Sequence, residues 1–195
     1  MPFAGFKSKL GQACHVFPLL LCVWFAAPAA ALDDHPGLYV HSASTHLKDG
    51  VFLMDAQLGY VLSQVAIEAL DSGVALTFEL EMEVYKPRKW AWNESVASLS
   101  QRYRIVYHAL SRQYIVTSLN SGVQNSYSSR STALLTMGRL TDIPLIDKKL
   151  LGGSGRWVRI RLSLAIDELP APLRPWAYIN SDWRLKSEWF EWQLK

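Results

Sequence analysis

The sequence predicts a mainly β fold: a single antiparallel β-sandwich-like domain, which is a β-rich α+β arrangement of about seven strands with two short helices. Three observations predict this fold class. Apolar and polar residues alternate at period two in several segments of strand length. The polar faces of these segments indicate antiparallel sheets with one side in water. Two short segments instead place a serine before apolar residues at helical spacing, which is typical of capped helices.

The chain begins with a segment typical of a secretory signal peptide, at residues 1–31. Lys7 and Lys9 form its positive region, residues 17–25 are apolar, and small residues lead to an A-x-A cleavage site at Ala31. Proline interrupts the apolar run, which is shorter than the about 20 residues that span a membrane. We therefore expect a secreted, periplasmic protein. The alternative is an uncleaved leader that anchors the same periplasmic domain to the inner membrane.

Both cysteines, Cys14 and Cys22, lie in this leader, so the mature domain is free of cysteine and must fold without disulfides. Without Lys7 and Lys9, 18 basic side chains face 17 acidic ones, a net charge of +1. Such a charge provides no electrostatic footprint for nucleic acid, which we exclude as a partner. We expect an N-terminal segment of the mature chain at residues 32–50, followed by a single β-rich domain at residues 51–195.

The first elements of the domain follow from local patterns. Residues 51–60 are predicted to form a strand. Ser63 can cap a helix that runs to about Leu70 and stops near Gly73. Residues 74–84 then alternate strictly, with apolar side chains on one face and mostly glutamates on the other. This pattern predicts a half-buried strand.

The rest of the domain repeats these patterns. Further strands are predicted at residues 102–107, 113–119, 158–166 and 188–194. The first two of them form a hairpin. Ser128 or Ser129 can cap a second short helix. The proline-rich residues 170–175 are expected to form a stiff, non-helical crossover.

One loop between predicted strands combines three cations with two indoles, and we take its residues as the candidate binding site: Lys86, Arg88, Lys89, Trp90 and Trp92. Such a tip could bind an envelope or inner-membrane protein, contact anionic lipid headgroups, or stack on sugar rings. The competing interpretation is that both indoles fold back to seal one end of the core. That interpretation is favoured from the sequence, because large aromatic side chains are usually mostly buried.

Three glutamates at period two, Glu79, Glu81 and Glu83, line one face of a predicted strand at a spacing that glycosidase carboxylates also use. Arg102 and Arg104 lie on what we expect to be a neighbouring strand. Cross-strand ion pairs on a solvated face therefore explain the pattern better than catalysis does. A carbohydrate-active or carbohydrate-binding domain is kept as the alternative function.

Three histidines lie near the mature N-terminus, at His35, His41 and His46. Imidazoles are common metal ligands, but this spacing matches no compact binding pattern, and the domain has no thiolates. The chain also carries no nucleophile-elbow motif. We therefore expect no metal, no cofactor and no catalytic residue.

Several short patterns follow one another along the mature chain, from about Val51 to Trp192. They are Leu53-Met54-Asp55-Ala56, Glu68-Ala69-Leu70-Asp71-Ser72-Gly73-Val74, Trp90-Ala91-Trp92, Arg102-Tyr103-Arg104-Ile105-Val106-Tyr107-His108-Ala109-Leu110, Leu169-Pro170-Ala171-Pro172-Leu173-Arg174, Ser181-Asp182-Trp183-Arg184-Leu185 and Ser187-Glu188-Trp189. In this order they resemble the Gram-negative bacterial secreted family catalogued as domain of unknown function 4390.

The resemblance implies an exported domain with no assigned activity, so it supplies no catalytic residues. It also implies a link to a membrane sensor kinase of the nitrogen-regulation type, near which such proteins are often encoded. Together with the absence of a catalytic motif, this favours a non-enzymatic interaction or accessory module of the cell envelope.

Overall fold

The structure is a computed structural model that describes residues 35–88, 90 and 92–194. The expected signal peptide at residues 1–31 and Lys89 of the candidate loop lie outside the described residues. The described residues belong to one compact unit. No helix among them is long and apolar enough to cross a membrane.

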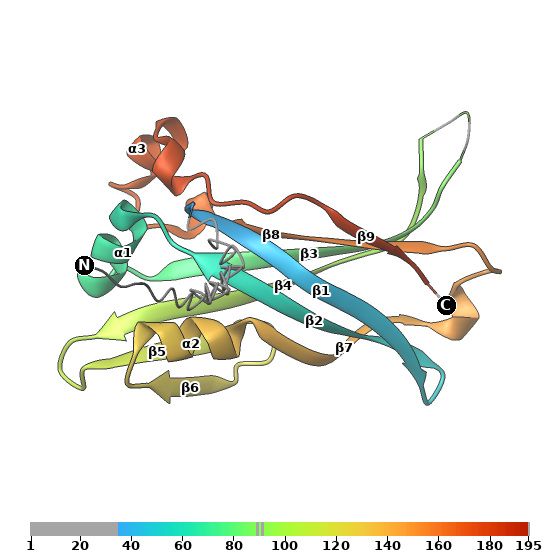
Figure 1. The fold of residues 1–195 in the computed structure, drawn as a ribbon, viewed down its shortest axis with the longest axis horizontal. Helices are drawn as coiled ribbons and strands as arrows, with labels where there is room; N and C mark the ends of the chain where they lie inside the picture. The colour runs from blue at the N-terminus through green and yellow to red at the C-terminus, as the bar shows by residue number, and fades with distance from the viewer. Residues whose placement is uncertain (1–34, 89, 91, 195) are drawn as a thin grey trace, which may run out of the picture. The chain divides into compact units, whose positions relative to one another are not determined.

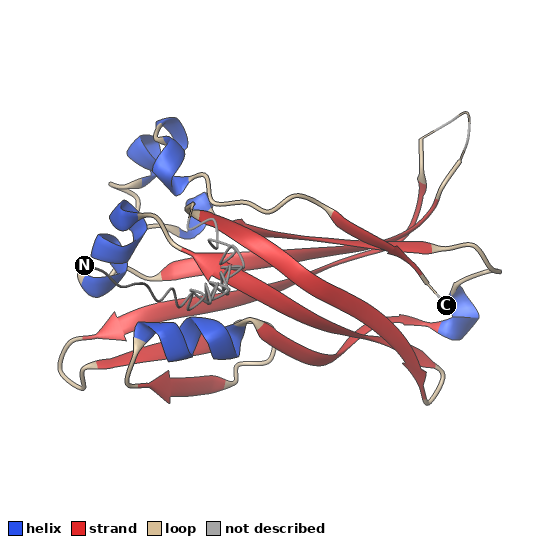
Figure 2. Cartoon of the chain, in the orientation of Figure 1, coloured by secondary structure: helices blue, strands red, loops and turns tan. Residues whose placement is uncertain are grey.

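Two antiparallel sheets make up the described part of the chain, and Figures 1 and 2 show the smaller sheet crossing in front of the larger one. The strand order is β1-β2-β7 in the first sheet and β6-β5-β4-β3-β8-β9 in the second. The strands are β1 (Gly37–Lys48), β2 (Val51–Val61), β3 (Leu76–Lys86), β4 (Glu94–His108), β5 (Gln113–Ser118), β6 (Gln124–Tyr127), β7 (Arg139–Asp147), β8 (Trp157–Leu164) and β9 (Phe190–Gln193). This confirms the β-rich α+β fold, with more strands among the described residues than the about seven predicted.

Three α-helices and three short 3₁₀ turns connect these strands. They are α1 (Gln64–Asp71), α2 (Arg130–Met137), α3 (Arg174–Ile179), η1 (Lys148–Leu150), η2 (Ile166–Glu168) and η3 (Ser181–Trp183). The predicted caps of the first two helices are confirmed. Ser63 Oγ accepts a hydrogen bond from Ala66 N at 3.2 Å, and Ser129 Oγ accepts one from Thr132 N at 3.2 Å.

β3 lies in the interior of the larger sheet and is paired on both sides. Leu80 lies opposite Gln101 of β4 and Leu162 of β8. The inward side chains of β3, including Phe78, Leu80 and Val84, are fully buried, whereas its glutamates are only partly exposed on the outer face. The predicted half-buried strand is therefore confirmed, and burying each such apolar side chain stabilises the fold by about 1.5–3 kcal/mol.

The apolar core joins the two sheets into a single cluster. Met54 of β2 and Ile160 of β8, from different sheets, both have no exposed surface and belong to it. The helices add Leu70 of α1 and Ala133 of α2, also with no exposed surface. This packing stabilises the described residues, which contain no cysteine and so no disulfide.

β1 lies in the segment 32–50 that was expected to precede the domain. It pairs with β2 along its whole length, from Gly37 opposite Val61 to Lys48 opposite Val51. Its many serine, threonine and histidine residues hide the alternation that reveals β3 in the sequence.

α3 corrects the prediction of a non-helical crossover at residues 170–175. Arg174 and Pro175 are its first two residues. Proline is tolerated in the first turn of a helix, where its missing N–H would have no partner within the helix. Pro175 therefore lies in the first turn of this helix, while Pro170 and Pro172 lie in the non-helical chain before it.

We predict that Gly138→Ala lowers the free energy of unfolding by about 2 kcal/mol, because it overpacks a close contact between α2 and β2. Leu58 N donates to Gly138 O at 2.8 Å, and a Cβ at Gly138 would collide with the carbonyl oxygen of Leu58. Urea denaturation measures the change. Thr136→Ala, at an exposed position of the same helix, is the control and should change it by less than about 0.5 kcal/mol. Equal effects of the two variants would contradict the close contact.

Candidate functional site

The candidate loop joins β3 and β4 at one end of the larger sheet. The last paired residues of the two strands are Lys86 and Glu94. Arg88 Nη2 lies 2.6 Å from Glu94 Oε2, so an ion pair crosses the base of the loop. In Figure 1 the ends of β3 and β4 rise away from the neighbouring strands at the upper right.

Both indoles of the loop are exposed. The exposed fraction is 97% for Trp90 and 92% for Trp92. The interpretation that these side chains fold back to seal the core is therefore wrong. Lys86 and Arg88 are exposed as well, so the described members of the candidate site all face solvent.

The charges of the loop are unequally compensated. The hydrogen bond and the positive charge of Arg88 lower the pKa of the Glu94 carboxyl below its usual range. Glu94 is therefore anionic at neutral pH and compensates Arg88. Lys86, which lies opposite Glu94 in the pairing of β3 with β4, forms no ion pair with any other described residue, but its charge also helps to lower the pKa of Glu94.

The predicted cross-strand ion pairs on the outer face of the larger sheet are confirmed for Glu79 and Arg102, whereas Arg104 pairs with Glu168 instead of a glutamate of β3. Glu79 Oε1 lies 3.2 Å from Arg102 Nε, across β3 and β4. On the other side of β3, arginines of β8 reach the two remaining glutamates. Arg161 Nη2 lies 2.6 Å from Glu81 Oε2, and Arg159 Nη2 lies 2.6 Å from Glu83 Oε2.

Trp189 covers two arginines of this ladder of ion pairs, a contact that the sequence patterns did not reveal. The ring of Trp189 lies 4.5 Å from the guanidinium carbon of Arg159 and 4.2 Å from that of Arg161, which is cation–π geometry. A glycosidase pair needs two carboxyls in different environments, one protonated and one ionised. Here Glu81 and Glu83 share the same arginine-paired surroundings, which fits a structural ladder and not an acid and base pair.

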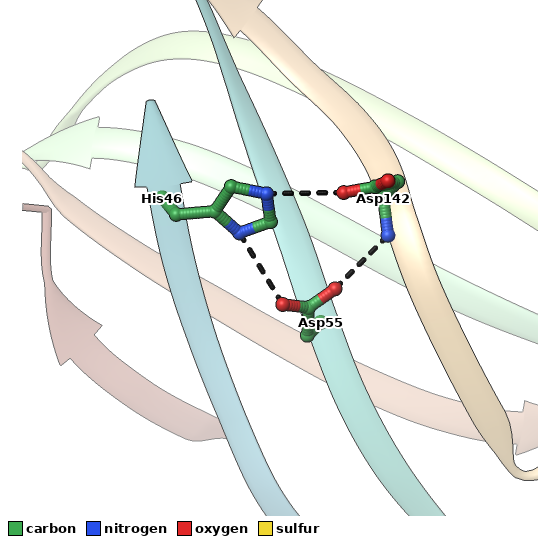
Figure 3. Close-up of side chains that lie close together, drawn as sticks. All are labelled: His46, Asp55 and Asp142. Carbon is green, nitrogen blue, oxygen red and sulfur yellow. Dashed lines mark hydrogen bonds and ion pairs between the residues drawn. The ribbon is translucent and has the colours of Figure 1, made fainter. Parts of the chain in front are cut away.

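The structure also brings together three residues from three strands: His46 of β1, Asp55 of β2 and Asp142 of β7 (Figure 3). His46 Nδ1 lies 3.2 Å from Asp55 Oδ2, and Nε2 lies 3.0 Å from Asp142 Oδ1. The backbone N of Asp142 donates to Asp55 Oδ1 at 2.9 Å. We call these residues the His46 cluster.

A β-bulge places Asp142 in the His46 cluster. The pairing of β2 with β7 shifts between Met54 and Ala56, and Asp142 adopts a φ of 54° there. This left-handed conformation is one that Asp tolerates better than most residues. Sequence spacing could not reveal the cluster, because its members are joined only by sheet pairing.

The donor atoms of the His46 cluster are of a kind that divalent metals bind. However, the two ring nitrogens of His46 contact different carboxylates. Lys48 Nζ also lies 3.4 Å from Asp142 Oδ2. Side chains of the chain itself therefore already occupy both carboxylates: His46 contacts Asp55, and both His46 and Lys48 contact Asp142. We interpret the cluster as a set of polar contacts that links the three strands of the smaller sheet. His35 and His41, the other two histidines considered as ligands, do not belong to it.

Fold and site together define a β-rich domain of two antiparallel sheets whose candidate site is an exposed loop. The family model described as "Domain of unknown function (DUF4390)" matches residues 35–193, and the chain belongs to this family, as the resemblance indicated. The matched range includes β1. No curated protein and no solved structure matches the chain.

We predict that Lys48→Met raises the pKa of Asp142 toward its usual value of 3.8, and by more than His46→Asn does. The hydrogen bond and charge of Lys48 are the first causes of the lowered pKa, ahead of those of His46. A lowered folded-state pKa stabilises the fold above the unfolded-state value, and this contribution is lost as the pH falls through the folded-state pKa. The carboxyl resonance of Asp142, followed by NMR against pH, measures the shift. A larger shift in His46→Asn would reverse the proposed order of causes.

Proposed function

We propose that the chain is an exported, non-enzymatic interaction module of the cell envelope, with the β3–β4 loop as its contact surface. The observation that carries this proposal is the exposure of Trp90 and Trp92, at 97% and 92%. Burying one large apolar side chain is worth about 1.5–3 kcal/mol, so a partner that covers both indoles gains substantial binding energy. Tryptophan and arginine also dominate the binding energy of many interfaces.

The proposed compartment is the periplasm, and its support is the leader-like sequence at residues 1–31. The absence of cysteine from the rest of the chain is compatible with that compartment, because the apolar core needs no disulfide. Candidate partners are therefore envelope components, including an inner-membrane protein such as the sensor kinase that the family resemblance implies. A leader that stays attached would hold the same domain on the same side of the membrane.

A second candidate function is carbohydrate binding through the same two indoles. Exposed tryptophans can stack on sugar rings, and Trp90 and Trp92 are free to do so. The glutamates of β3 are engaged with arginines, which favours binding over hydrolysis in this second candidate.

We predict that photoreactive residues placed at positions 90 and 92 of the exported chain capture an envelope component in vivo. The same residue at position 135, an exposed leucine of α2, is the control and should not capture it. Mass spectrometry of the captured product identifies it as protein, lipid or polysaccharide. Equal capture from all three positions, or none from 90 and 92 in a folded and exported chain, would contradict the proposed contact surface.

We also predict that replacing both indoles, Trp90→Ala and Trp92→Ala, leaves the free energy of unfolding within about 0.5 kcal/mol of the original value. The reason is that neither side chain contributes to the core. Trp183→Ala, at a position only 2% exposed, should by contrast cost about 3–5 kcal/mol. Urea denaturation compares the variants, and a large loss in the double variant would show that the indoles pack onto the fold.

A further inference from the structure

Two other segments lie at the same end of the domain as the β3–β4 loop. Tyr85 of β3 is paired with Trp157 of β8, so the chain that leads into β8 adjoins the loop. Lys148 N donates to Gly50 O at 2.9 Å, which joins the η1 turn to the β1–β2 turn. Figure 1 shows these turns and the β3–β4 loop gathered at the right-hand end of the sheets. We call the described residues 47–50, 86–88, 90, 92–94 and 147–151 together the loop end.

The loop end concentrates the positive charge of the mature chain. Its five basic residues are Lys48, Lys86, Arg88, Lys148 and Lys149, and its three acidic residues are Asp49, Glu94 and Asp147. Without Lys89, which lies outside the described residues, the loop end carries a net charge of +2, and Lys48 pairs with Asp142 beyond it; the whole chain without the leader carries +1. The side chains of Lys148 and Lys149 are exposed and form no ion pair with a described residue.

Exposed apolar side chains lie among these charges. Leu150 of η1 is 70% exposed and Leu47 of β1 is 44% exposed, in addition to the two indoles of the loop. The apolar groups thus come from three separate turns and are interspersed with lysines.

We propose that the loop end binds the surface of an anionic lipid bilayer. Tryptophan favours the headgroup region of a membrane, and lysine can extend its charge along the surface while its stem contacts apolar groups. Each basic residue near an anionic membrane strengthens binding by about fivefold. This inference rests on the proposed function, because it names the partner of the same contact surface.

The binding geometry follows from the direction of the strands. β1 begins with Gly37 at the far end of the domain and reaches the loop end after 12 residues. At about 3.3 Å per residue, the first strand starts about 40 Å from the loop end. A domain bound through its loop end therefore stands on the membrane with α1 and α3 held away from the lipid.

The test is flotation of the purified exported chain with two kinds of vesicle. One contains equal parts of phosphatidylglycerol and phosphatidylcholine, and the other contains phosphatidylcholine alone. We expect binding to the anionic vesicles only, with a loss on raising the salt concentration. The double variant Lys148→Gln and Lys149→Gln should weaken binding by about 30-fold, and Trp90→Ala with Trp92→Ala by at least about tenfold.

Two variants at other exposed positions control for general effects of charge and hydrophobicity. Lys186→Gln removes a cation near Ser163, at the far end of β8, and Leu135→Ser removes an exposed apolar group from α2. Both should bind the anionic vesicles as the original chain does. Circular dichroism confirms that every variant is folded.

Each outcome bears on the inference. Binding that is lost only in the loop-end variants supports it. Absence of binding, equal binding to neutral vesicles, or binding that the loop-end variants leave unchanged overturns it. If vesicles do not bind but positions 90 and 92 capture an envelope protein in vivo, the lipid inference falls and the proposed function stands. If neither occurs, both fall.

Discussion

The constraint on which the rest of the structure depends is the burial of one apolar face of β3 between the two sheets. Phe78, Leu80 and Val84 have no exposed surface, and neither does Met54 from the smaller sheet. The described residues contain no cysteine and therefore no disulfide, so this packing must supply the stability. Because the period of a strand is two, burying these residues forces the intervening glutamates onto the outer face.

The charged side chains on this outer face pair with one another. Glutamates of β3 pair with arginines of β4 and β8, and Trp189 lies over two of those arginines. A ligand that used these carboxylates would first have to displace an arginine and lose a charge-assisted hydrogen bond. The loop end differs, because Lys86, Lys148 and Lys149 have no ion-pair partner among the described residues. Binding there breaks no existing ion pair of these lysines, and this contrast supports the proposed contact surface at the end of the sheets over one on their face.

Sequence patterns predicted the helices and strands that are specified by residues close together in the chain. Strict alternation revealed β3, and the serine caps located the starts of α1 and α2. β1 escaped detection because its polar residues mask its alternation, although the pairing with β2 determines it. α3 escaped because Pro175 is compatible with a first helical turn but was interpreted as a helix breaker.

The sequence predicted which residues the candidate site contains but not whether their side chains are exposed. The sequence shows that cations and indoles share a loop, yet whether Trp90 folds back depends on the hairpin reaching past the core, which no local pattern encodes. Likewise, the contribution of Leu150 and Lys148 became visible only in the structure, where the pairing of β2 with β7 places η1 beside the β1–β2 turn. The His46 cluster could not be predicted from the sequence either, because it depends on the pairing of three strands and on a β-bulge.

The ion pair at the base of the loop bears on how strongly the indoles can bind. Arg88 and Glu94 lie 2.6 Å apart and link the two strands just before the exposed tip. An exposed pair of this kind adds little to folding stability. It does restrict the arrangements of the loop before a partner arrives, and ordering a contact surface in advance lowers the entropic cost of binding. The same pair also compensates the negative charge of Glu94. A carboxylate paired with arginine repels an anionic partner less than a free one does. A polar contact that is weak as a support of the fold can therefore be important for binding.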